Sequence, residues 1–375
     1  MAAGPAHWHE QGSTVGISGV GALNGLGFNA HQTWAFWRAE ATAMTETPFR
    51  CANGTRATMV LARTLPPRML GMERLEALAV GALEQLLPAL GVLRGTGERA
   101  MWLGLPERYG PGTAPEHLAE LRRLEQRLKA WCERHVGGLD IILVPRGHSS
   151  LGCAIEAFSE VAAGRVAVAI VGGVDTYYAP EVVDALLEQE RLFDGKNLDS
   201  FIPGEGAAFL LLTRPKMALR HGLSTLARVE AVTTGLEPGA MFAEVPCTGN
   251  GLAQVMRTAT RGLPASGRRL EWLLGDLTNE SYRTQEFQLA LPRAIAPGGL
   301  DSAGRDFYPV ATDEMQLDFL PMRFGDLGAA TLPTAMVIAS QAFMRGAPIA
   351  SSCLAVASSV GQDRGAVLLT PAPRS

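Results

Sequence analysis

The sequence predicts an α/β fold with parallel strands, built from two duplicated halves. Buried strands and amphipathic helices alternate along almost all of the 375 residues, a pattern typical of strands joined by right-handed helical crossovers. The uninterrupted apolar run VAVAIVGGV at 166–174 indicates a central strand covered on both faces. An internal repeat is also visible, because 147–173 and 325–359 share one layout: a Gly-containing polar turn, an Ala-rich helix and a buried strand. The expected halves are 1–215 and 225–375.

Residue patterns predict each element of the first half. Trp34 and Trp37, three residues apart, indicate the buried face of a helix after a Gly-rich turn. The segment 72–90 has the 3.6-residue apolar period of a packed helix. The region 97–135 has the highest charge density and is expected to be a surface insertion. We expect strands at 14–20, 102–107, 139–145, 166–174 and 201–214, a turn and helix at 21–40, and helices at 72–90, 116–135 and 153–165.

The second half repeats this alternation. Its longest predicted helix, within 324–346, is rich in alanine, which suits close packing of one half against the other. We expect strands at 227–235, 270–277, 351–359 and 364–371, and helices at 251–263, 284–295 and 324–346.

Composition excludes several classes of function. The net charge of −4 and the pI near 6.0 argue against nucleic acid or an anionic membrane as the main partner. The five cysteines are scattered without a Cys-x-x-Cys pair, which favours reduced thiols over a structural zinc site. The N-terminus lacks the features of a signal peptide, and the apolar runs fall short of the ~18 residues of a membrane span. We therefore expect a cytoplasmic protein with no membrane span and no cofactor.

The stretch RGHSSLGCAI at 146–155 is the strongest candidate for a functional site. It follows the apolar run IILVP and opens a predicted helix, and a nucleophile often lies at such a strand-to-helix turn. Two residues compete for that role, His148 and Cys153.

Three segments resemble the β-ketoacyl-acyl-carrier-protein synthases. They are the opening strand, Gly turn and helix at 15–37, the turn, helix and strand ending in Gly-Gly within 147–178, and the Gly-Glu-Gly strand within 199–214. The resemblance implies a thiolase-like fold of five layers, αβαβα, that dimerises across edge strands.

The resemblance also implies the chemistry. The family uses a cysteine that takes the acyl chain at a helix N-terminus and two histidines that donate hydrogen bonds to an oxyanion. The cysteine position lies six residues before Ala154 and falls on His148. Ser149 and Ser150 follow it as small residues of the pocket, and Cys153 falls in the body of the helix.

Carboxylates take both histidine positions. The family's Gly-His turn aligns with Gly325 and Asp326, and its other histidine aligns best with Asp276. The family's lysine falls on Pro321. A carboxylate at neutral pH only accepts hydrogen bonds, so Asp276 and Asp326 would repel an oxyanion. We expect a pseudoenzyme without condensing activity.

Three interpretations of His148, Asp276 and Asp326 stay open. They could form a metal site of one histidine and two carboxylates or a His–Asp general base. They could also be polar residues that simply hold one another by hydrogen bonds, and we expect this third arrangement, with no metal. Glu205, in GEGAA, matches a family glutamate of structural role, and Asp175 is expected at the pocket or the dimer interface.

These features predict a non-catalytic partner-binding, adaptor or accessory protein. The partner could be a second copy or another thiolase-fold chain, with an acyl carrier protein, acyl-CoA or a secretion effector as further possibilities. Synthase-like proteins of this kind resemble both partner subunits of active synthases and proteins encoded beside type VI secretion effectors. The alternatives are an acyltransferase or thioester hydrolase that uses His148 with Asp326 or Asp276, and a protein that binds acyl chains.

Overall fold

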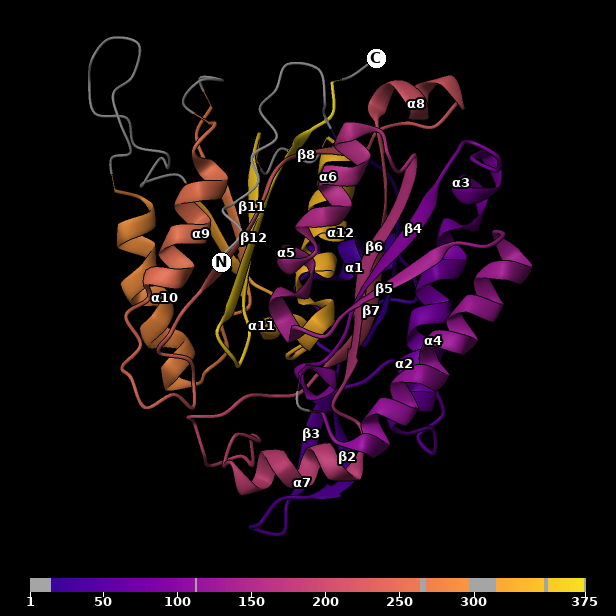
Figure 1. Cartoon of the computed structure of the whole chain (residues 1–375). Helices are drawn as coiled ribbons and strands as arrows, with labels where there is room; N and C mark the ends of the chain where they lie inside the picture. The colour runs from indigo at the N-terminus through magenta and orange to yellow at the C-terminus, as the bar shows by residue number, and fades with distance from the viewer. Residues whose placement is uncertain (1–14, 112, 264–267, 297–314, 347–349, 374–375) are drawn as a thin grey trace.

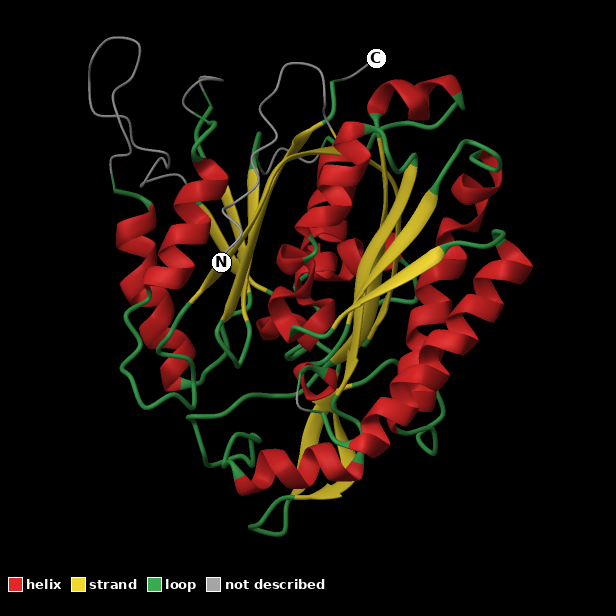
Figure 2. Cartoon of the chain, viewed as in Figure 1, coloured by secondary structure: helices red, strands yellow, loops and turns green. Residues whose placement is uncertain are grey.

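The protein has five layers, α-β-α-β-α, in a computed structural model that describes residues 15–111, 113–263, 268–296, 315–346 and 350–373. Figure 1 shows helices on both outer faces, two walls of strands between them and further helices enclosed at the centre. The secondary-structure view in Figure 2 shows the same alternation of layers. The predicted α/β thiolase-like fold is confirmed.

The two halves have the same sheet topology. The first half orders its strands β1-β7-β6-β4-β5, and the second orders its strands β8-β12-β11-β9-β10. In each half the first two pairings are antiparallel and the last two are parallel. The strands are β1 (Val15–Asn24), β4 (Arg99–Gly104), β5 (Asp140–Val144), β6 (Val168–Thr176), β7 (Glu205–Thr213), β8 (Ala227–Leu236), β9 (Trp272–Gly275), β10 (Gln316–Phe319), β11 (Cys353–Ser358) and β12 (Asp363–Pro371).

One short antiparallel pairing joins the halves. β1 and β8 meet only through Val15–Val229, Gly16–Arg228 and Ile17–Ala227, so the ten strands of the two halves form one continuous sheet. In the first half, β6 and β7 are buried along their whole length, as strands covered on both faces must be.

Helices cover the outer faces and fill the centre. The outer helices of the first half are α2 (Gly71–Leu83), α3 (Leu87–Val92) and α4 (Pro115–His135), and those of the second half are α9 (Asn250–Thr260) and α10 (Ser281–Ala294). The central helices are α1 (Ala30–Arg38), α5 (Ser150–Cys153), α6 (Ile155–Ala163) and α12 (Thr331–Met344). Residues 331–342 of α12 are all buried, which explains why this helix is apolar around its whole circumference.

The halves touch closely where glycines face backbone. A Cβ atom on Gly173 in β6 would collide with the carbonyl oxygen of Ala329, and a Cβ on Gly152 in α5 would lie 2.6 Å from the Cα of Gly365 in β12. Real side chains do not tolerate such distances, so glycine is required at both positions for the central helices to pack on the strands.

Residues 97–135 are not a surface insertion, contrary to the expectation from their charge. They contain β4, which lies between β5 and β6 in the sheet, and α4, whose buried face includes Leu124, Leu128 and Trp131. The high charge belongs to the solvent-facing side of an outer helix, and charge density alone does not distinguish such a helix from an insertion.

Several short elements were not predicted. Strands β2 (Met44–Arg50) and β3 (Arg56–Val60) form a separate hairpin, and α7 (Pro180–Glu188), α8 (Pro215–Arg220) and α11 (Pro321–Phe324) lie in the connections. β2 has only one buried residue, Thr47, so it shows none of the apolar alternation that marks a strand.

One helical stretch, 71–92, is long and apolar enough to cross a membrane by length and composition alone, which the count of apolar runs in the sequence did not indicate. In the structure its buried face packs on β1, β6 and β7. It also holds a fully buried arginine, Arg74, in an ion pair with Glu205. Both features belong to a helix of the protein core.

Candidate functional site

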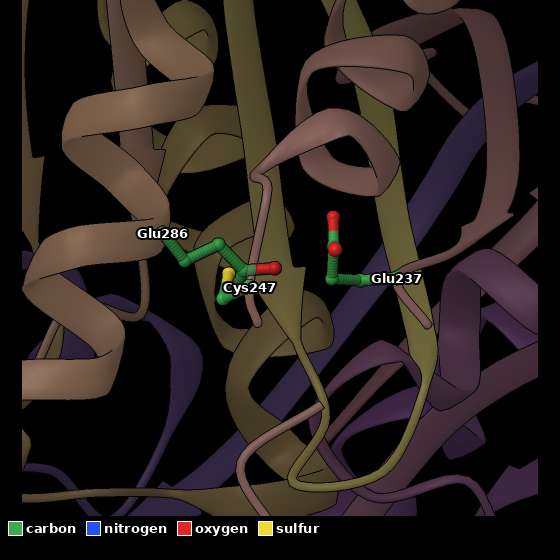
Figure 3. A group of neighbouring side chains, drawn as sticks. All are labelled: Glu237, Cys247 and Glu286. Carbon is green, nitrogen blue, oxygen red and sulfur yellow. The ribbon is translucent and has the colours of Figure 1, made fainter. Parts of the chain in front are cut away.

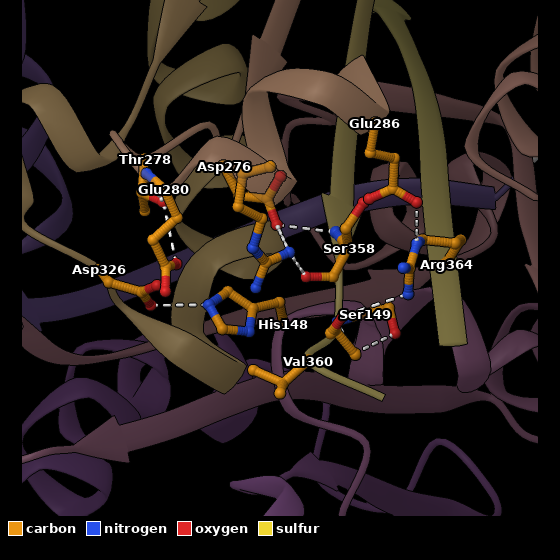
Figure 4. Close-up of polar contacts among 12 residues, drawn as sticks. His148, Ser149, Asp276, Thr278, Glu280, Glu286, Asp326, Ser358, Val360 and Arg364 are labelled. Atoms are coloured by element: carbon orange, nitrogen blue, oxygen red, sulfur yellow. Dashed lines mark hydrogen bonds and ion pairs between the residues drawn. The ribbon is translucent and has the colours of Figure 1, made fainter. Parts of the chain in front are cut away.

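The predicted site residues lie together in the turns between strands and central helices of the two halves. His148 lies in the 3-10 turn η3 (Gly147–Ser149) after β5, and Asp326 lies in the turn before η5 (Gly328–Ala330), the start of the α12 segment. Asp276 follows β9 directly. Figure 4 shows the three side chains in one buried region.

His148 and Asp326 form a buried ion pair. The Nε2 atom of His148 lies 2.7 Å from Oδ1 of Asp326, and the side chains are 4% and 1% exposed. The same carboxylate oxygen accepts hydrogen bonds from the Tyr177 hydroxyl at 3.0 Å and the Gly328 N–H at 2.8 Å. The Nδ1 atom of His148 and the Oδ2 atom of Asp326 have no hydrogen-bond partner among the described residues.

The contact between His148 and Asp326 favours the charged form of each side chain. Burial alone would lower the pKa of His148, but the charge of Asp326 and its hydrogen bond outweigh burial and raise that pKa above 6.5. Burial alone would raise the pKa of Asp326, but the charge of His148 and its hydrogen bond, helped by Arg283, hold it well below 3.8. His148 therefore carries protons on both ring nitrogens over more of the neutral range than a free histidine does.

Asp276 is engaged by a separate set of donors. Its Oδ2 accepts a hydrogen bond from the Ser358 N–H at 2.7 Å and lies 3.4 Å from the Arg283 guanidinium. That guanidinium also donates to the Ser358 carbonyl. Asp276 thus fixes the end of β11, and its charge acts on His148 from a distance.

Arg283, on α10, is a site residue that the sequence did not reveal. It is 2% exposed, and its Nε and one terminal nitrogen are buried without a partner among the described residues. The Arg283 guanidinium offsets part of the negative charge of Asp276 and Asp326. From the sequence alone, we expected no cation to balance these two carboxylates. The only hint was its position seven residues after Asp276, which any helical arginine could share.

A cavity of about 370 Å³ opens beside His148. Asp175, Tyr177 and Arg108 also line it, and Arg108 lies 3.5 Å from Oδ1 of Asp175. The other oxygen of Asp175 accepts a hydrogen bond from the Ala329 N–H at 3.0 Å. Volumes in this range hold small molecules in other proteins, and the cavity places Asp175 in the pocket rather than on an outer surface.

Ser149 and Ser150 form hydrogen bonds with Ser359 and with backbone groups rather than with His148. Ser149 Oγ lies 2.6 Å from Ser359 Oγ, and Ser359 also accepts from the Ser149 N–H. Ser150 Oγ accepts from the Arg146 N–H at 3.1 Å. Both hydroxyls therefore serve to close the turn.

Cys153 lies at the C-terminal end of α5, half-buried, with its Sγ 3.5 Å from the Thr234 hydroxyl. Burial raises the pKa of its thiol to about 11. A nucleophilic cysteine needs a lowered pKa, so this thiol stays protonated at neutral pH.

Glu205 anchors α2 to the sheet. Its two carboxylate oxygens receive a bidentate pair of bonds from Arg74, at 2.5 Å and 2.6 Å. The Thr176 hydroxyl and the Ala62 N–H donate to it as well. All of its contacts hold elements together.

One other group of side chains has metal-ligating atoms close together. Within the described ranges, Glu237, Cys247 and Glu286 have ligand atoms within 4.8 Å of one another, and no such group includes His148. Figure 3 shows these three side chains. Arg364 already occupies Glu286 at 2.6 Å, and Glu237 accepts from the Gly251 N–H at the start of α9. These carboxylates are used for an ion pair and a helix cap, and a nearby guanidinium would repel a cation.

The comparisons with known proteins agree with this geometry. Residues 146–218 match the family model of the N-terminal domain of β-ketoacyl synthases. A ketosynthase from module 6 of the bacillaene synthase of Bacillus subtilis 168 is similar in structure, with a TM-score of 0.71 at 12% identity over 96% of this chain and 72% of that one. Curated protein sequences gave no match.

Two further structures are similar over almost their whole length. A ketosynthase in complex with its type II acyl-carrier protein and bound to the hexaketide has a TM-score of 0.75 at 11% identity, covering 96% of this chain and 99% of that one. The ishigamide ketosynthase/chain length factor has a TM-score of 0.72 at 16% identity with the same coverage.

The class of protein that these findings define is a thiolase-fold protein with the architecture of a ketosynthase. Residues 146–218, which include His148, are similar to the β-ketoacyl synthase family model, and the structural likeness shows that the whole described chain has a ketosynthase-like, thiolase-type fold.

Proposed function

We propose that this chain is a non-condensing, ketosynthase-like subunit that binds a partner instead of joining acyl chains. One observation carries the proposal: His148, at the position that the family uses for its nucleophile, is held in a buried ion pair by Asp326. A protonated imidazole has no lone pair for attack on a thioester.

The oxyanion would also lack its usual partners. Condensation needs donors directed at the developing negative charge, whereas Asp326 and Asp276 only accept hydrogen bonds. Arg283 is a cation nearby, but one of its terminal nitrogens is engaged by Asp276 and Ser358. The arrangement favours a pocket whose charges balance one another.

The partner surface that we propose is the edge strand β5. In the described sheet β5 pairs with β4 on one side only, and its Ile142, Leu143 and Val144 are half-buried rather than covered. An open strand edge with apolar side chains is a site for pairing with another chain. Structural neighbours include a ketosynthase/chain length factor and a ketosynthase with its acyl-carrier protein, which supports a thiolase-fold partner or a carrier protein as the binding class.

An assay with acyl and malonyl thioesters tests the proposal. We expect no ketoacyl product and no acyl-enzyme by mass spectrometry. A ketoacyl product that disappears in His148→Ala would overturn it.

Analytical sedimentation tests the partner surface. Leu143→Lys in β5 should abolish assembly, whereas the control Leu198→Lys, at an exposed leucine elsewhere, should leave it unchanged.

The second candidate is an acyltransferase or thioester hydrolase, favoured by the unpartnered Nδ1 of His148 beside the cavity. That role would need the imidazole to lose a proton, so hydrolysis should increase with pH and depend on His148. Thioester turnover that shows neither property would exclude this candidate.

A further inference from the structure

A second cavity lies at the opposite end of the first-half sheet from His148. It has a volume of about 700 Å³ and is lined where β4 and β6 begin and β7 ends, by Glu98, Ala167 and Arg214 among others. β6 has 9 residues at about 3.3 Å each, which separates the cavity from Asp175, near the far end of β6, by roughly 25–30 Å. Residues of α8 line the cavity, and Figure 1 shows α8 at one end of this sheet and α7 at the other.

Positive charge dominates this cavity. Its basic side chains are Arg94, Arg165, Arg214, Lys216 and Arg220, against the single carboxylate of Glu98. Glu160 neutralises one of them, Arg165, through two bonds of 2.7 Å. Arg214, Lys216 and Arg220 form no side-chain hydrogen bond or ion pair with any described residue. A chain with a net charge of −4 therefore concentrates uncompensated cations in one hollow.

Two of the cations lie against neighbouring backbone. Arg94 donates a hydrogen bond to the His135 carbonyl at the end of α4, at 2.8 Å. The Arg214 guanidinium lies against Gly164, the left-handed residue that ends α6, so closely that a Cβ there would be 2.7 Å from it. This close approach places the Arg214 charge at the wall of the cavity.

We propose that this basic cavity, defined by Arg94, Arg214, Lys216 and Arg220, binds a small phosphorylated molecule. Guanidinium and ammonium groups bind phosphate oxygens through strong charge-assisted hydrogen bonds. The volume matches that of small-molecule pockets, and Pro215, Met217 and Ala167 give it apolar walls for an organic group. The net negative charge of the chain disfavours a long polyanion over a compact one.

Isothermal titration with pyrophosphate, ADP and ATP tests the proposal on the full chain. We expect saturable 1:1 binding that weakens as NaCl increases from about 50 to about 200 mM, because charge–charge attraction is screened. Arg214→Gln combined with Arg220→Gln should weaken binding at least about tenfold, since two charge-assisted hydrogen bonds are removed. Lys216→Gln should weaken it by a smaller factor.

The matched controls are Arg56→Gln and Lys196→Gln, two exposed cations outside the cavity, which should leave the affinity unchanged. All substituted side chains are exposed, so circular dichroism should show folded variants. Absence of binding of all three probes, or equal weakening in the controls, overturns the proposal. Tighter binding of duplex RNA or of phosphatidic acid vesicles than of ADP also contradicts it, because either would indicate an open charged surface.

Discussion

His148 and Asp326 are 178 positions apart in the chain, yet they form a buried ion pair of 2.7 Å. The first residue belongs to the central helix segment of the first half, and the second to the equivalent segment of the second half. The pair therefore ties the two halves together across their interface. Its energetic and pH-dependent properties can be measured.

Removing one member of the pair should destabilise the protein strongly. Asp326→Asn leaves the buried His148 without its counter-charge, and His148→Ala leaves the buried Asp326 carboxylate without one. Each change should lower the free energy of unfolding by about 3–5 kcal/mol. Urea denaturation measures the loss in the free energy of unfolding. The double variant should lose clearly less than the sum of the two single losses; additive losses would show that the two side chains are not coupled.

Stability should depend on pH through His148. Its pKa in the folded protein lies above the ordinary value of 6.5, so its contribution is fully present below pH 6.5 and is lost as pH increases through the folded-state pKa. The pKa of Asp326 is lowered from 3.8, so its contribution is present above pH 3.8 and is lost only in stronger acid. In urea denaturation, the unsubstituted protein should become less stable as the pH increases above neutral, whereas the stability of His148→Gln should not decrease in this range. Parallel pH profiles of the two proteins would contradict the pairing.

A second buried ion pair can be compared with an exposed ion pair of the same bidentate geometry, which isolates the effect of burial. Arg74 and Glu205 form a bidentate pair that is 1% and 0% exposed, whereas Arg165 and Glu160 form one that is 63% and 23% exposed. Arg74→Ala should cost about 3–5 kcal/mol, because Glu205 stays buried without its counter-charge. Arg165→Ala should cost much less, because solvent screens an exposed ion pair. Thermal or urea denaturation of both variants checks the difference, and equal losses would refute this explanation.

Gly173 should not tolerate a methyl group. Its β6 backbone faces the carbonyl of Ala329, so Gly173→Ala must separate the central segment from the strand, at a cost of several times the ~1 kcal/mol of an average substitution. Gly91→Ala is the control, because nothing lies within 4 Å of its Cβ position in α3 and alanine favours a helix. Expression yield and melting temperature should fall for the first variant alone. A stable Gly173→Ala protein would mean that the halves are less closely packed.

The fold could be predicted because its signals are local and repeated. The Gly turn, Ala-rich helix and buried strand occur at 147–173 and again at 325–359, and the structure gives both segments equivalent places beside β6 and β11. Exposed elements such as β2 lacked that pattern. The misinterpretation of 97–135 shows the limit, because solvent-facing charges on α4 conceal a buried face.

The site could be predicted only in part. Alignment with a family motif selected His148 and Asp326 as positions, but their contact depends on tertiary structure. Arg283 is one of many helical arginines in the sequence, and only the position of α10 against Asp276 and Ser358 brings it into the pocket.

The burial of α12 has a consequence for the chain during synthesis. All strands of the first-half sheet have been made once residue 213 emerges, but α12, which packs on β1, β6 and β7, ends at Met344. At about 5–20 residues per second, the ribosome needs on the order of 10 s for that interval. A nascent chain of this protein would expose one apolar sheet face for that time, which makes it a natural substrate for chaperones that bind hydrophobic surfaces during translation.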